Sequence, residues 1–123
     1  MKFVDKIFFY GQLKSDGIFF PMYKRYVLNI EKGYTYGTLY KYKNRPVYIP
    51  RGDNKIYGEI LTFFNTKTVF KLLDNVEYYL KRILGKCYRV SDNSCISSYI
   101  YIIEDFEESE LSEIATGIWL NKK

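Results

Sequence analysis

The chain has 123 residues, and its 19 Lys and Arg against 14 Asp and Glu leave a net charge of +5. Apolar residues make up 47 % of it and aromatic residues 20 %, which excludes a disordered chain and fits one packed domain over residues 1–123. It contains no histidine, so any catalysis must use carboxylates, tyrosines, lysines or backbone groups, and we expect neither a metal nor a cofactor.

The chain opens with a β-prone run over residues 6–10 that stops at Gly11, as a buried strand entering a tight loop does. Residues 12–17 are polar and predict a loop. Residues 18–30 group their apolar side chains and carry Pro21 near the start, which leaves a helix and an extended segment both open. The opening therefore predicts one strand, a loop and an undetermined segment.

Antiparallel strands and a helix are predicted in the middle of the chain. Alternation predicts strands over residues 34–42, 46–49 and 56–63, with turn residues over 51–54 before the last of them. A helix is expected from about Lys67, because candidate N-caps precede apolar residues at helical spacing. Those apolar positions are Val69, Leu72, Leu73, Val76 and Leu80.

A hairpin and an acidic connector complete the predicted elements. Residues 86–90 and 95–103 alternate on either side of a polar turn. Residues 105–112 form the acidic connector, and the tail closes on Gly117 and Trp119. Together these elements predict a mostly antiparallel sheet, closed or strongly curved, with at least one helix packed on it.

Several features indicate a protein of the cytoplasm. No apolar run approaches the roughly 20 residues of a membrane-spanning helix, and residues 1–10 lack a small-residue cleavage site. We therefore expect a soluble, unexported protein with no membrane partner. Cys87 and Cys95 are interpreted as reduced, half-buried thiols, with a disulfide across the predicted hairpin as the alternative.

The basic charge raises nucleic acid as a partner. The lysines are scattered singly rather than in a run of five or more, which is typical of a solvated face. Residues 34–43 interleave aromatic and cationic side chains, as a single-strand stacking platform also does. A coding bias explains this composition more simply, so we do not expect nucleic acid to be the partner.

Glycines mark two candidate features. Gly11 follows the first strand, where free backbone amides would make an anion site, although a simple turn is the plainer interpretation of this residue alone. Glycines also interrupt the β-prone residues 33–40 and 57–59, where they indicate a bulge or a close backbone approach.

The other candidate is a pair of carboxylates. Asp74 and Glu77 are three residues apart in the predicted helix, so they share a side of it. Both lie within a turn of Leu73 and Val76, which allows one of them to face inward. An apolar cavity raises the pKa of a carboxylate toward the range of a general acid or base. An exposed helix carboxylate is the plainer interpretation of either residue alone.

Six segments along the chain form a pattern. They are Phe9–Lys14, Gly37–Tyr40 with Arg45–Pro46, Tyr57–Ile60, Leu73–Glu77, Tyr88–Val90 and Thr116–Trp119. Taken in this order, the segments resemble the gamma-glutamylcyclotransferase-like family, also called AIG2-like. The first is similar to the family's Tyr-Gly-Ser/Thr-Leu-Lys signature, and the fourth to its Leu-Asp-x-x-Glu-Gly motif. The resemblance spans nearly the whole chain and rests on order, because each segment alone is weak.

The resemblance implies an α+β fold, a small mixed but mainly antiparallel β-barrel with packed helices. It also implies a cavity for a small γ-glutamyl compound or another anionic ligand. The backbone amides of Gly11, Gln12 and Leu13, beside Tyr10, would hold the substrate carboxylate. Glu77 would act as general base, so that the substrate's α-amino group attacks its own γ-carbonyl and releases 5-oxoproline.

The sequence departs from the family pattern at several positions. Gln12 stands where a Ser or Thr is usual, Tyr78 replaces the glycine after the motif glutamate, and Ile118 takes the place of the closing aspartate. A tyrosine of the late strand lines the pocket in the family. Tyr99 is the preferred candidate for that role, with Tyr101 as the alternative.

Two functions follow from the resemblance. The first is an enzyme, a γ-glutamyl cyclotransferase, which the retained Glu77 favours. The second is a non-catalytic member of the same fold that binds or sequesters a small anionic ligand, which the changes at Gln12 and Tyr78 favour. Neither the substrate nor the oligomeric state is indicated by the sequence.

Overall fold

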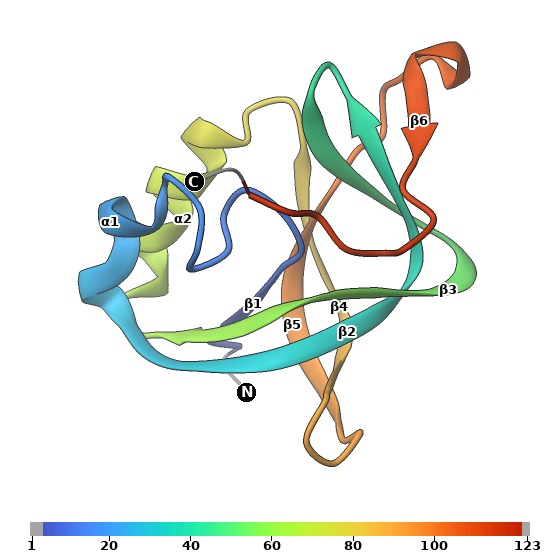
Figure 1. Cartoon of the computed structure of the whole chain (residues 1–123). Helices are drawn as coiled ribbons and strands as arrows, with labels where there is room; N and C mark the ends of the chain where they lie inside the picture. The colour runs from blue at the N-terminus through green and yellow to red at the C-terminus, as the bar shows by residue number, and fades with distance from the viewer. Residues whose placement is uncertain (1–3, 122–123) are drawn as a thin grey trace.

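The computed structural model describes residues 4–121, and its sheet is built around the first strand (Figure 1). Strand β1 (Lys6–Phe9) pairs antiparallel with β3 (Arg45–Phe63) on one side and parallel with β5 (Cys95–Ile102) on the other. A strand with neighbours and packing on both sides needs apolar residues on both faces, which explains the continuous apolar run in β1.

The remaining strands close the sheet into a barrel. Strand β4 (Lys81–Arg89) is antiparallel to β5 and joins it to β2 (Val27–Tyr42), which pairs in turn with β3. The short strand β6 (Leu111–Glu113) is added at the end of β2. This arrangement confirms the predicted α+β fold, a small barrel that is mainly antiparallel.

The long hairpin of β2 and β3 corrects one prediction. Its turn lies at Lys43 and Asn44, both with a left-handed φ, as a tight two-residue hairpin requires. The residues predicted as a turn, 51–54, lie instead within β3, where pairing steps from Gly37↔Asn54 to Thr38↔Ile49. Thus β3 is one strand with an outward excursion, because β2 stays paired on both sides of it.

The helices lie together on one side of the barrel (Figure 1). Helix α2 (Thr66–Val76) confirms the predicted helix, although Leu80 of the predicted apolar stripe lies beyond its end. The undetermined segment contains both predicted possibilities: α1 (Phe20–Tyr23) and the 3-10 turn η1 (Lys24–Tyr26) are followed directly by β2.

Apolar side chains form one cluster on each face of β1. Ile7 and Phe9 pack toward α2 and its residue Leu73, whereas Phe8 and Tyr10 belong to the cluster inside the barrel. This alternation follows from the pleat, which turns successive side chains to opposite faces. The first strand therefore couples the helix layer to the barrel interior.

The late segments differ in detail from the predictions. The hairpin is longer than predicted because β4 begins at Lys81. The acidic connector contains a 3-10 turn, η2 (Glu108–Glu110), as well as β6. Cys87 is buried and Cys95 exposed, and both are free thiols, so the alternative of a hairpin disulfide is wrong. Within residues 4–121, no helix has the length and apolar character needed to cross a membrane.

Candidate active site

The loop after β1 approaches the β2–β3 hairpin so closely that only glycine fits at its start. A Cβ on Gly11 would lie 2.3 Å from Cγ of Pro46, far inside van der Waals contact. Gly11 also begins a turn, because its carbonyl accepts a hydrogen bond from the backbone N–H of Lys14 at 3.1 Å. The glycine is therefore required by close packing as well as by the turn.

Side chains from neighbouring elements hold this loop in place by hydrogen bonds. Glu59 of β3 accepts hydrogen bonds from both the backbone N–H and the hydroxyl of Ser15, each at 2.6 Å. The hydroxyl of the buried Tyr23 donates to the backbone carbonyl of Leu13. The loop is thus held by hydrogen bonds to its backbone and to the hydroxyl of Ser15.

The C-terminal segment runs back along the same loop (Figure 1) and holds it by further hydrogen bonds. Lys14 Nζ donates to the backbone carbonyl of Trp119 at 2.8 Å. Asn121 Nδ2 donates to the carbonyl of Gly11 at 3.2 Å and to Asp16 Oδ1 at 2.8 Å. Residues more than 100 positions apart in the chain therefore share one hydrogen-bonded unit.

The backbone amides of this loop are available to a ligand. Within residues 4–121, no acceptor takes a hydrogen bond from the N–H of Gly11, Gln12 or Leu13. Successive free N–H groups in a fixed loop form a concave site for an anion. This geometry is compatible with the anion site predicted at Gly11.

Glu77 lies directly behind this loop, at the end of α2. The helix ends at Val76, and the backbone N–H of Glu77 caps it by donating to the carbonyl of Leu73 at 2.8 Å. Glu77 itself leaves the helical conformation, with φ −98° and ψ 41°, and the residue is only 3 % exposed. The prediction that Asp74 and Glu77 share one side of the helix is therefore wrong.

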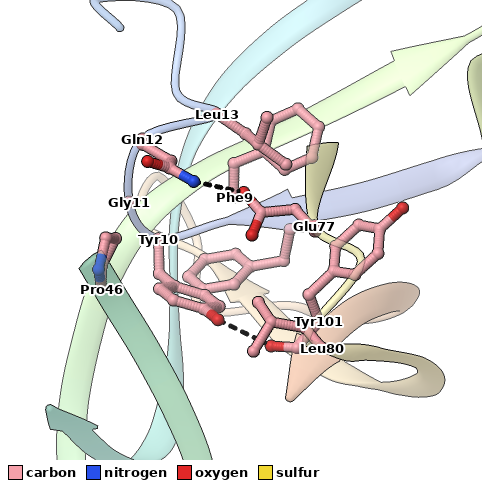
Figure 2. A pocket seen from close by; sticks show the side chains of 10 residues that line it. Phe9, Tyr10, Gly11, Gln12, Leu13, Pro46, Glu77, Leu80 and Tyr101 are labelled. Atoms are coloured by element: carbon pink, nitrogen blue, oxygen red, sulfur yellow. Dashed lines mark hydrogen bonds between the residues drawn. The ribbon is translucent and has the colours of Figure 1, made fainter. Parts of the chain in front are cut away.

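The carboxylate of Glu77 is only partly satisfied. Its Oε1 accepts a hydrogen bond from Gln12 Nε2 at 2.8 Å (Figure 2), whereas Oε2 is buried with no donor among the described residues. Burial raises the pKa of Glu77, an effect opposed by the amide of Gln12, the hydroxyl of Tyr79 and the guanidinium of Arg45. A buried carboxylate with an unpaired oxygen is suited to taking up a proton.

Glu77 and the loop face each other across one small cavity (Figure 2). Its volume of about 20 Å³ accommodates little more than one water molecule. Five of the predicted site residues meet here. The lining residues are Phe8, Phe9, Tyr10, Gly11, Gln12, Leu13, Pro46, Glu77, Leu80 and Tyr101.

The late-strand tyrosine at this cavity is Tyr101, which corrects the preferred choice. The hydroxyl of Tyr10 donates to the backbone carbonyl of Tyr101 at 2.8 Å. Tyr99 packs instead against Phe70, with ring centroids 5.0 Å apart. Residues two apart in a strand share a face, so the sequence alternation identified the face but left the register undecided between them.

Asp74 supports this tyrosine from outside the cavity. Its carboxylate accepts a hydrogen bond from the hydroxyl of Tyr101 at 2.6 Å and forms an ion pair with Arg82 at 2.8 and 3.0 Å. Asp74 is therefore satisfied by strong donors at the protein surface. It helps to orient a cavity wall and does not itself line the cavity.

Sequence reasoning missed several lining residues. Phe8 appeared only as a member of a strand, Phe9 in that strand and in the family pattern, and Leu80 as part of the helical stripe. Pro46 appeared in a strand and in the family pattern, without a place at the site. The only available signal was the pairing of a glycine loop with a proline, because a proline ring packs well against a residue without Cβ. The sequence alone does not show which strand brings that ring to the loop.

The fold is similar to that of several solved proteins. YkqA from Bacillus subtilis matches with a TM-score of 0.75 and 18 % identity over 95 % of this chain, which spans 40 % of that protein. An AIG2-like protein from Mus musculus matches with a TM-score of 0.75 and 16 % identity, over 99 % of this chain and 98 % of the other. The ytfP protein of Escherichia coli has a TM-score of 0.61 and 21 % identity, with coverage of 94 % and 96 %.

The sequence comparisons are more selective. No curated protein matches the chain. A family model does match, and it covers residues 7–121, from the first strand to the segment that closes the loop. This span includes every residue around the cavity. The chain therefore belongs to the family described as gamma-glutamyl cyclotransferase, AIG2-like.

Proposed function

We propose that this protein is a γ-glutamyl cyclotransferase that releases 5-oxoproline from a small γ-glutamyl amine or peptide. One observation carries the proposal: a buried glutamate faces a loop of free backbone amides across a single cavity. The amides match the α-carboxylate of a γ-glutamyl group, and the glutamate matches its α-amino group. Family membership supports the same reaction class.

In this reaction the substrate supplies its own nucleophile. The amides of Gly11, Gln12 and Leu13 hold the α-carboxylate, and Glu77 takes a proton from the α-ammonium group. The free amine then attacks the γ-carbonyl carbon and forms a new C–N bond, which closes a five-membered ring. The bond to the original amine breaks as that amine receives the proton from Glu77. The ring nitrogen gives up its second proton to the departing amine, so 5-oxoproline and a protonated amine leave.

The surroundings of Glu77 suit this proton transfer. Burial raises its pKa, which makes the carboxylate a better base than an exposed glutamate. Because nucleophile and electrophile belong to one molecule, holding the substrate in a ring-closing conformation supplies much of the rate acceleration. The absence of histidine is therefore compatible with the proposed chemistry.

Gln12 occupies the position at Glu77 that the substrate's amino group would take. Its carboxamide donates to the same oxygen that would receive the proton. A cavity of about 20 Å³ is too small for a γ-glutamyl group, so binding requires this side chain to swing away. The backbone amide of Gln12 can then hold the carboxylate, whatever its side chain does.

The test is 5-oxoproline release from a panel of γ-glutamyl amines, γ-glutamyl dipeptides and glutathione. Glu77→Gln keeps the shape of the side chain but removes the base, so we expect release to fall at least about a hundredfold. Circular dichroism and thermal melting establish that the variant is folded. Unchanged release from a folded Glu77→Gln protein would exclude the proposed role.

A second function is favoured by the closed cavity. A folded protein that releases no 5-oxoproline from the whole panel would be a non-catalytic member that binds a small anionic ligand. In that case Gln12 and Glu77 form a stable internal pair rather than a displaceable one. Calorimetric titration with γ-glutamyl compounds, run on the same preparation, separates this binder from a protein with no affinity for them.

A further inference from the structure

A second hollow lies beside the Glu77 cavity, between the loop after β1, the β2–β3 hairpin and the C-terminal segment. Its volume is about 380 Å³, against about 20 Å³ for the cavity itself. We call it the Trp119 hollow. It is lined by Gln12 and Ile18 of the loop, by Lys41 and Asn44 of the hairpin, and by residues 119–121.

The side chain of Gln12 borders both spaces. It lines the Glu77 cavity as well as the Trp119 hollow, and its amide nitrogen donates to Glu77 Oε1 at 2.8 Å (Figure 2). The proposed reaction requires this side chain to leave the carboxylate, so that the substrate can bind. The partition between the two spaces is then removed, and the cavity opens toward the hollow.

The β2–β3 hairpin presents one of its faces to both spaces. Lys41, which lines the hollow, is the direct partner of Pro46, which lines the cavity, in the antiparallel ladder of these strands. Residues directly opposite each other in such a ladder have their side chains on the same face of the sheet. The wall of the cavity and the wall of the hollow are therefore continuous on one face of the hairpin.

Hydrogen bonds tie the C-terminal wall of the hollow to the proposed anion loop. Asn121 Nδ2 donates to the carbonyl of Gly11 at 3.2 Å, and the carbonyl of Trp119 accepts from Lys14 Nζ at 2.8 Å. The Trp119 ring also packs against the cluster inside the barrel. The wall is thus held in a defined position relative to the amides proposed to bind the α-carboxylate.

Three apolar side chains of the hollow face solvent. Ile18 is 79 % exposed and Leu120 is 81 % exposed, and the Trp119 ring beside them is half-buried. Large apolar side chains gathered around one exposed hollow are typical of a binding site. Of the described residues that line the hollow, only Lys41 is charged, so a cationic group would be repelled there. The hollow therefore matches an apolar ligand group.

We propose that the Trp119 hollow binds a large apolar group on the amine half of the substrate. The glutamyl half occupies the space at Glu77, and the leaving amine extends past Gln12 into the hollow. The inference rests on the proposed cyclotransferase activity and names its substrate class, γ-glutamyl compounds whose amine half carries a bulky apolar side chain. Ile18, Trp119 and Leu120 act as binding residues, and none takes part in proton transfer.

The experiment compares γ-glutamylphenylalanine with γ-glutamylglycine, which differ only in the side chain of the leaving amino acid. We expect kcat/KM of the wild type to favour the phenylalanine compound by about tenfold or more, because its ring is removed from water in the hollow. The ratio of the two kcat/KM values is the readout, since a change at Glu77 or in the anion loop acts on both compounds equally.

Leu120→Ala and Ile18→Ala remove apolar surface from the hollow at exposed positions, so the packed core stays intact. We expect each to lower the ratio about threefold, and the double variant to bring it close to one. Leu28→Ala is the matched control, because Leu28 is 62 % exposed on β2 and lies outside the lining of the hollow. Equal reductions in Leu120→Ala and Leu28→Ala would show that general surface hydrophobicity sets the preference.

The outcomes separate this inference from the proposed function. Turnover of both compounds with equal kcat/KM, or a preference that persists in the double variant, overturns the role of the hollow and leaves the cyclotransferase intact. If neither compound is turned over, calorimetry decides: tighter binding of γ-glutamylphenylalanine that is lost in the double variant supports an apolar subsite in a non-catalytic protein. Binding that is absent, or unchanged in that variant, contradicts the inference.

Discussion

Asp74 and Glu77 are carboxylates three residues apart, yet they occupy opposite environments. Asp74 is 49 % exposed and is paired with Arg82, whereas Glu77 is 3 % exposed and accepts one hydrogen bond, from the neutral amide of Gln12. The difference arises where α2 ends, because Glu77 is the first residue to leave the helix. One turn of chain thus separates a structural carboxylate from a candidate base.

This comparison shows what a functional carboxylate requires. Asp74 stabilises its surroundings through strong donors, which occupy both of its carboxylate oxygens. Glu77 keeps one oxygen unpaired in the protein interior, where an unpaired acceptor costs about 1–3 kcal/mol. The protein retains a cost in stability at the position where a proton would be transferred.

The largest effect is expected when each of the two carboxylates is neutralised in turn. We expect Glu77→Gln to lower 5-oxoproline release at least about a hundredfold, whereas Asp74→Asn lowers it by less than about fivefold. Steady-state rates with one γ-glutamyl substrate measure both. A larger loss in Asp74→Asn than in Glu77→Gln, with both proteins folded, would show that the base has been assigned to the wrong residue.

The second prediction concerns the hydrogen bond to Glu77. Gln12→Met keeps the length of the side chain but removes the donor that lowers the pKa of Glu77. Because the base must be ionised, we expect the acid limb of the kcat/KM profile to move to higher pH in this variant. An acid limb at the same pH in both proteins would show that the group titrating in this limb is not Glu77.

The third prediction concerns stability at Asp74. Asp74→Asn weakens the pairing with Arg82 and the hydrogen bond from Tyr101, so we expect a loss of about 1 kcal/mol in the free energy of unfolding at pH 7. Urea denaturation measures the change. The loss should shrink at high salt, which screens the exposed ion pair; a salt-independent loss would assign the effect to Tyr101 alone.

A stability effect of similar size but opposite sign is expected at Glu77. Its folded pKa is raised, so the wild type loses stability as the pH rises through that value and the buried group ionises. Glu77→Gln should therefore match the wild type below about pH 4 and exceed it by about 1 kcal/mol at pH 7. Thermal melts across this pH range test the prediction. A Glu77→Gln protein that is less stable than the wild type at pH 7 would mean that the charge of the Glu77 carboxylate is well solvated.

The elements that follow from local pattern were predictable. Helix α2 and the β4–β5 hairpin carry their own periodicity and turn residues, so the sequence indicates them directly. Residues 51–54 were predicted as a turn, because local composition cannot tell whether the neighbouring strand stays paired across the excursion at residues 50–53. That outcome depends on β2, which is distant in sequence.

The candidate site likewise depends on contacts between residues that are distant in sequence, which local patterns do not predict. The order of family motifs placed Glu77 and the loop after β1 together, and the structure brings them to one cavity. The hydrogen bond between Gln12 and Glu77 joins residues 65 positions apart, and no periodicity encodes it. The choice between Tyr99 and Tyr101 failed for a related reason, since strand alternation fixes a face but not a position along it.

The hydrogen bonds of Trp119 and Asn121 to the loop after β1 have a consequence for biosynthesis. The loop is translated before Trp119 and Asn121, whose contacts with it span 105 and 110 positions of the chain. A nascent chain can pair its early strands while this loop still lacks its outer support. The proposed anion site is therefore completed only after Trp119 and Asn121 have been translated, so a nascent chain that lacks them does not yet hold the loop in its final geometry.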